Sequence, residues 1–131
     1  MARLYAMDIG TVSWFDLTVP NADAVRDFYR AVIGWGVQEC AMGDYSDYVM
    51  TLPGNGKGVA GVCWARGVNT GLPPVWLMYV TVADLDASIA SVQERGGKVL
   101  LGPKNMGESR YCVIEDPAGA SLALYQPAPS R

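Results

Sequence analysis

The chain has 131 residues, of which 50% are hydrophobic and 18% charged, and its formal net charge is −3. That length suits one domain with a real core, no apolar run approaches the roughly 20 residues that cross a bilayer, and the acidic balance argues against a nucleic-acid partner. The N-terminus lacks the apolar segment of a secretory signal, and the three cysteines are odd in number and widely spaced. We therefore expect a cytoplasmic protein with reduced thiols and no membrane association.

The first half of the sequence predicts one strand, one helix and three further strands. The helix is indicated by apolar residues at i, i+3, i+4, i+7 and i+8, namely Val25, Phe28, Tyr29, Val32 and Ile33. Asn21 can cap this helix, and Gly34 can end it in a left-handed conformation. β-branched and aromatic residues between turn residues place the strands at 12–19, 35–41, 47–52 and 58–64.

The second half predicts the same order of elements after a Gly- and Pro-containing linker at 66–74. Its helix has an apolar stripe of Leu85, Ile89 and Val92, and Asp84 is placed to cap it. The Gly96-Gly97 pair is placed to stop this helix. The predicted strands are 75–82, 98–102, 110–115 and 121–126.

The two halves are related by an ungapped shift of 63 residues. Identical residues fall together under that shift, including Thr18 and Thr81, Tyr48 and Tyr111, and Ala60 and Ala123. We therefore predict an α+β fold, a single domain over 1–131, built from two βαβββ modules at about 9–65 and 75–127. Because each module has a helix on one face of its sheet only, we expect the two sheets to join as a curved, open half-barrel with a cleft.

Three features resemble a known family. The duplicated βαβββ pattern, the segment TVPNADAVRDFYRAVIGW and the hairpin EDPAGASLALYQP are similar to the vicinal oxygen chelate superfamily, which includes glyoxalases, bleomycin resistance proteins and extradiol dioxygenases. The resemblance covers about residues 9–127. Since the same fold hosts many activities, it implies the architecture more strongly than the reaction. Relatives of this kind often pair, so the resemblance also implies a homodimer.

The resemblance further implies a divalent metal in the cleft, bound by side chains of the first and last strands of each module. The matching positions here are Trp14, Ala60, Leu77 and Ala123, and none of these side chains binds a metal. The chain contains no histidine to replace them. We therefore expect neither a metal site nor a cofactor. A new site would have to come from acidic residues such as Asp16, Glu39, Asp44, Asp47 or Glu115.

Strand alternation predicts which side chains line the cleft instead. If Trp14 faces the cleft, so do Asp16 and Thr18, and in the second module Leu77, Tyr79 and Thr81 do the same. The family's usual hairpin geometry adds Tyr48, Met50, Tyr111 and Val113. The predicted ligand-binding residues are Trp14, Tyr48, Leu77, Tyr79, Tyr111 and Tyr125. The alternative is that these aromatic residues only pack the groove or a dimer interface.

Three functions are compatible with this cleft. The first is a metal-independent small-molecule-binding protein that holds an aromatic or planar ligand. The second is a metal-independent isomerase or lyase in which Asp16, the one acid expected in the cleft, acts as general base. The third is a degenerate scaffold or subunit. The sequence does not decide whether the protein is an enzyme, and Asp16 has the alternative of a structural hydrogen-bonding role.

Overall fold

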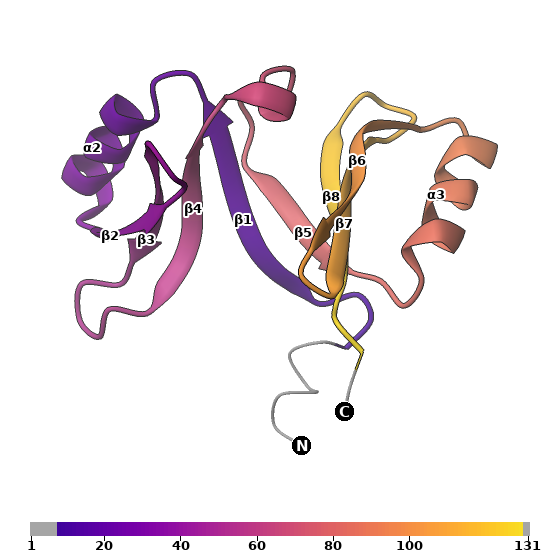
Figure 1. Ribbon diagram of the computed structural model, residues 1–131, viewed down its shortest axis with the longest axis horizontal. Helices are drawn as coiled ribbons and strands as arrows, with labels where there is room; N and C mark the ends of the chain where they lie inside the picture. Colours follow the sequence, from indigo (N-terminus) through magenta and orange to yellow (C-terminus); the bar gives the residue numbers. More distant parts are fainter. Residues whose placement is uncertain (1–7, 130–131) are drawn as a thin grey trace. The chain divides into compact units, whose positions relative to one another are not determined.

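The computed structural model describes residues 8–129, and its elements follow the order βαβββ twice (Figure 1). The first set is β1 (Val12–Val19), α2 (Ala22–Ile33), β2 (Gly36–Ala41), β3 (Ser46–Thr51) and β4 (Gly58–Trp64). A short 3-10 helix, η1 (Gly67–Asn69), lies in the predicted linker. The second set is β5 (Leu77–Thr81), α3 (Leu85–Glu94), β6 (Lys98–Met106), β7 (Ser109–Glu115) and β8 (Ser121–Gln126). The α+β class and the repeated order of elements are confirmed.

Neither helix in the described part of the chain is long and apolar enough to cross a membrane.

The chain forms two compact units. The first unit is Phe15–Trp76, and the second unit comprises Leu77 onward together with the residues before Phe15. The division falls within β1, between Trp14 and Phe15. Residues Asp16 to Val19 of β1 pair in parallel with β4, and just before β1 the amide of Gly10 and the carbonyl of Thr11 hydrogen-bond to Thr81 of β5. The strand order is β2-β3-β4-β1 in the first unit and β1-β5-β8-β7-β6 in the second.

The core of the first unit lies between α2 and its strands. Leu17, Val19, Met50 and Val62 are buried there, and Val25 and Tyr29 of α2 pack against them. The predicted apolar stripe of α2 is only partly buried: the exposed fractions of Phe28, Val32 and Ile33 are 58%, 64% and 51%. The stripe is therefore wider than the strip of helix that the strands cover. Gly34 ends α2 in the left-handed region, as predicted, but the Asn21 side chain makes no capping hydrogen bond.

The core of the second unit is built in the same way around α3. Leu85, Cys112, Ile114 and Leu124 are buried, with Ile89 among the partly buried residues packed against them. Asp84 caps α3, because its carboxylate accepts a hydrogen bond of 3.1 Å from the amide of Ala87. Gly96 has a φ of 89°, which only glycine adopts without strain, so the helix stops where the sequence predicts.

The two modules differ by one residue in strand register. In the second unit Tyr79 of β5 pairs with Ala123 of β8. Under the shift of 63 the matching pair in the first unit is Asp16 and Ala60, but Asp16 pairs with Gly61. The β3–β4 hairpin itself has the same pairing as β7–β8, so the whole hairpin is displaced by one residue along β1. A one-residue slip moves every side chain of the hairpin to the opposite face.

Candidate functional site

Three of the predicted tyrosines gather on one face of the second unit. We call this the distal face, meaning the side of the strands turned away from α3. Alternation puts Cys112 and Ile114 of β7 against α3, so Tyr111 and Val113 lie on the distal face. Tyr111 is paired directly with Tyr125 across β7 and β8, and Tyr79 joins them from β5. The three tyrosines therefore share one face, as alternation predicts, and ligand binding by them stays a prediction.

The rings of Tyr79 and Tyr111 meet across β8. Their centroids are 6.1 Å apart, with an interplanar angle of 40°. Ala123 on β8 is paired with Tyr79 on one side and with Val113 on the other. Because a methyl group is all that β8 presents there, the two larger rings can approach each other above it. Leu77, two residues before Tyr79, is 1% exposed, so it belongs to the floor of the face rather than to its surface.

Thr81 lies on the same face, as alternation predicts, although it was not among the predicted ligand-binding residues. It is two residues after Tyr79 on β5 and is paired with Tyr125 on β8. Its side chain is buried, and its hydroxyl oxygen has no hydrogen-bond partner. The repeat had singled out this threonine as the match of Thr18, but a repeat cannot reveal that a hydroxyl will be buried without a partner.

Tyr48 does not lie where the sequence predicts. It is buried in the core of the first unit with Leu17, Val19 and Met50, and the guanidinium of Arg26 on α2 lies 4.6 Å from its ring centroid. The reason is the one-residue slip of the β3–β4 hairpin, which turns Tyr48, Met50 and Val62 toward α2. The expected cleft positions of Tyr48, Met50 and Ala60 were therefore wrong.

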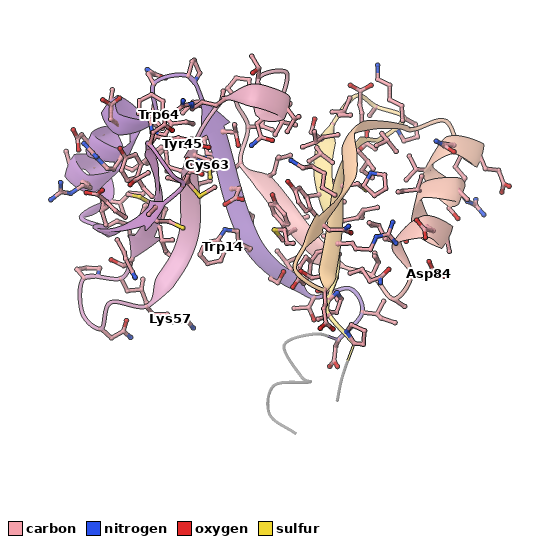
Figure 2. The ribbon with its side chains drawn as sticks, viewed as in Figure 1. Trp14, Tyr45, Lys57, Cys63, Trp64 and Asp84 are labelled. Carbon is pink, nitrogen blue, oxygen red and sulfur yellow. The ribbon has the colours of Figure 1, made fainter. Side chains whose placement is uncertain are left out.

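The same slip places Asp47 and Cys63 on the face of the first unit turned away from α2, where alternation along β1 also puts Asp16. Asp16 is on β1, Cys63 on β4 (Figure 2), and Asp47 on β3. The Asp47 carboxylate accepts a hydrogen bond of 2.9 Å from the amide of Trp64. Burial raises the pKa of the Cys63 thiol, and the negative charges of Asp16 and Asp47 raise that pKa further. Asp16 therefore has a thiol and a second acid nearby, and its role as a general base stays a prediction.

Trp14 lies on β1 next to Phe15, where the chain passes from the second unit to the first, and is half-buried. The register corrects one of the four positions matched to metal ligands: the counterpart of Ala123 is Gly61 rather than Ala60. Trp14, Gly61, Leu77 and Ala123 offer no side-chain lone pair that suits a divalent ion. Among residues 8–129, no group of three or more His, Cys, Asp or Glu side chains is arranged to hold a metal ion. The donor set does not fit a bound metal.

The duplicated βαβββ fold indicates the class of protein, and comparison with known families agrees with it. Residues 11–124 match the model of the Glyoxalase/Bleomycin resistance protein/Dioxygenase superfamily. Since the match covers most of the chain, the protein belongs to this superfamily, and the resemblance inferred from the sequence is confirmed at that level.

Curated relatives align with nearly all of the chain but are longer. The putative glyoxylase CFP32 of Mycobacterium tuberculosis is 35% identical over 123 residues, which cover 89% of this chain and 46% of the relative. The anthracycline biosynthesis protein DnrV of Streptomyces peucetius is 32% identical over 134 residues, covering 89% of this chain and 47% of the relative. The chain thus spans about half the length of the curated relatives it matches.

Solved structures show the same fold at low sequence identity. Methylmalonyl-CoA epimerase from Mycobacterium tuberculosis aligns with a TM-score of 0.51 and 20% identity, covering 90% of each chain. A superfamily member from Vibrio splendidus aligns with a TM-score of 0.55 and 16% identity, covering 86% of this chain and 96% of that one. At these identities the likeness concerns the fold alone.

Proposed function

We propose that this protein is a metal-independent small-molecule-binding member of its superfamily, and that it holds a flat aromatic ligand against the distal face of the second unit. The observation that carries the proposal is the group formed by Tyr79, Tyr111 and Tyr125 on the face opposite α3. Tyrosine rings give large contact areas with few rotatable bonds, and their quadrupoles favour offset or edge contacts with another aromatic ring. The phenol oxygens add polar groups at the edge of the same surface.

Two further observations support this reading. Trp14, Gly61, Leu77 and Ala123 occupy the positions that match metal-binding residues in the family. None of them can bind the metal ion that a chelating ligand would need. In addition, one relative at 32% identity is named for the biosynthesis of anthracyclines, which are flat, polycyclic aromatic compounds. A face lined by tyrosines suits that class of molecule.

The proposal is tested by binding of 2-naphthol, a soluble flat aromatic probe, measured by isothermal titration calorimetry. We expect Tyr111→Ala to weaken binding by about tenfold, because ring stacking and the apolar area it buries are lost together. Tyr111→Phe keeps the ring and should retain most of the affinity. Tyr45→Ala is the matched control, since Tyr45 lies in the turn between β2 and β3, where Arg66 stacks on it at 3.9 Å.

Equal affinities for the wild type and Tyr111→Ala would contradict the proposal, as would a wild type that binds no aromatic probe. Circular dichroism of each variant shows whether a loss of binding comes from the site or from unfolding.

A further inference from the structure

The hydroxyl group of Thr81 is unusual in this chain because it is buried and unpaired. The residue is 1% exposed. In the part of the chain that the structure describes, only Thr81 Oγ1 and Asn69 Oδ1 are buried side-chain polar atoms without a hydrogen-bond partner. Most buried hydroxyl groups in proteins are hydrogen-bonded, because burying one unpaired costs free energy. An unpaired hydroxyl within the proposed binding face is a candidate for contact with a ligand.

The neighbours of Thr81 are the residues of the proposed binding face. Along β5 it follows Tyr79 with one residue between them, so both side chains point to the same side of the strand. Across β8 its pair is Tyr125, and Tyr125 is in turn paired with Tyr111. Tyr79, Tyr111 and Tyr125 are each only half-buried, in contrast to Thr81. The unpaired hydroxyl thus lies at the base of a group of rings that are partly accessible.

We propose that Thr81 is the hydrogen-bonding position of this face and selects flat aromatic ligands that carry a hydroxyl or carbonyl oxygen at their edge. This inference rests on the proposed function, because the tyrosine rings would bind the ligand and the Thr81 hydroxyl would determine which ligands are preferred. The threonine hydroxyl can donate to a carbonyl oxygen and can accept from a phenol. A ligand oxygen that reaches Thr81 would give Oγ1 the hydrogen-bond partner that it lacks.

The experiment compares two probes that differ by one oxygen, naphthalene and 2-naphthol, in the wild type and in Thr81→Val. Valine has nearly the shape of threonine without the hydroxyl. We expect the substitution to weaken 2-naphthol binding by about three- to tenfold and to leave naphthalene binding unchanged. Thr81→Ser should keep the preference for 2-naphthol. Thr18→Val is the matched control, because Thr18 holds the same place in the repeat but is paired with Cys63 instead of a tyrosine.

A second measurement separates a binding role from a structural one. Since the hydroxyl is unpaired in the free protein, Thr81→Val should raise the melting temperature without ligand, by about 3 °C. A hydroxyl needed for folding would give the opposite shift.

The possible outcomes separate the role of Thr81 from the proposed binding of flat aromatic ligands. If the wild type binds both probes equally and Tyr111→Ala weakens the binding of both, the proposed aromatic binding face is supported and the role of Thr81 is overturned. Equal weakening of both probes by Thr81→Val also overturns it, because that indicates altered packing. If the wild type binds neither probe, the proposed function fails and the role of Thr81 fails with it.

Discussion

At the scale of single residues, Cys112 shows how burial changes the chemistry of a side chain. It is 0% exposed in the core beneath α3, next to Leu85 and Leu124. Burial raises the pKa of its thiol from 9.0 to about 11, because the thiolate would lose its hydration. Cys112 is therefore a small apolar core residue at neutral pH and not a nucleophile.

This pKa shift predicts a change of stability with pH. The folded protein binds the thiol proton more tightly than the unfolded chain does, so this contribution to stability is complete below pH 9.0 and is lost as the pH rises toward about 11. Cys112→Ala should be less stable than the wild type at pH 8, since it leaves a cavity. The difference in free energy of unfolding should then narrow between pH 9 and pH 11.

Urea unfolding at several pH values measures this difference. Cys112→Val, which also lacks the thiol, should show the same narrowing. If the difference in free energy of unfolding between wild type and variant stayed constant from pH 9 to pH 11, the pKa of the Cys112 thiol would not be raised by folding.

At the scale of elements, the two helices begin differently although they hold the same place in the repeat. The Asp84 side chain, at the start of α3 (Figure 2), accepts a hydrogen bond from Ala87 and so pairs one of the free amides of the first turn. Asn21 precedes α2 without such a bond. Both residues are of the types that cap helices, so the sequence predicts two caps where the structure has one.

Asp84→Ala should therefore lower the free energy of unfolding by about 1 kcal/mol, the usual contribution of a side-chain cap. Asn21→Ala is the matched control, and its effect should be no more than a few tenths of a kcal/mol. Chemical denaturation followed by circular dichroism measures both. Equal losses in the two variants would contradict the difference in capping.

The register of the β3–β4 hairpin is the other difference between the modules. Tyr48 and Tyr111 match in the repeat, yet Tyr48 packs beneath α2 and Tyr111 lies on the distal face of the second unit. Apolar Met50 and Val62 move with Tyr48 into the core, while Asp47 moves to the opposite face. The observed register thus buries the apolar side chains of Met50 and Val62 and keeps Asp47 away from α2, as expected when one face of a strand is buried.

At the scale of the whole molecule, the proposed metal independence has a consequence for stability. A protein without such ligands should gain no stability from a divalent ion, because only a ligand that binds the folded state shifts the folding equilibrium.

We therefore expect elemental analysis of the purified protein to find no stoichiometric transition metal, and excess EDTA to leave the melting temperature unchanged. Native mass spectrometry of the same sample reports any small organic molecule that remains bound. One metal ion per chain, lost together with stability on chelation, would contradict the metal-independent reading and direct attention to the acidic residues.

The sequence alone determined the order of the elements and some of their bounds, although β6 runs on to Met106, beyond the predicted 98–102, and β5 is shorter than the predicted 75–82. Its prediction for β1, 12–19, agrees with the structure, and so do those for β4 and β8 at 58–64 and 121–126. These features are local: periodicity, turn residues and helix ends such as Gly34 depend on neighbours in the chain. Alternation within each strand is local as well. It places Tyr79, Tyr111 and Tyr125 on one face only when the pairing of their three strands is also known.

Only the tertiary structure decided how the β3–β4 hairpin sits on β1, and with it the place of Tyr48. Alternation says which residues share a face, but not which face meets the helix, because that depends on pairing between distant segments. The unpaired hydroxyl of Thr81 also appears only in the folded protein, since burial and missing partners arise from strands that meet across the sheet. The repeat predicted two equivalent modules, and a register shift of one residue made their faces different.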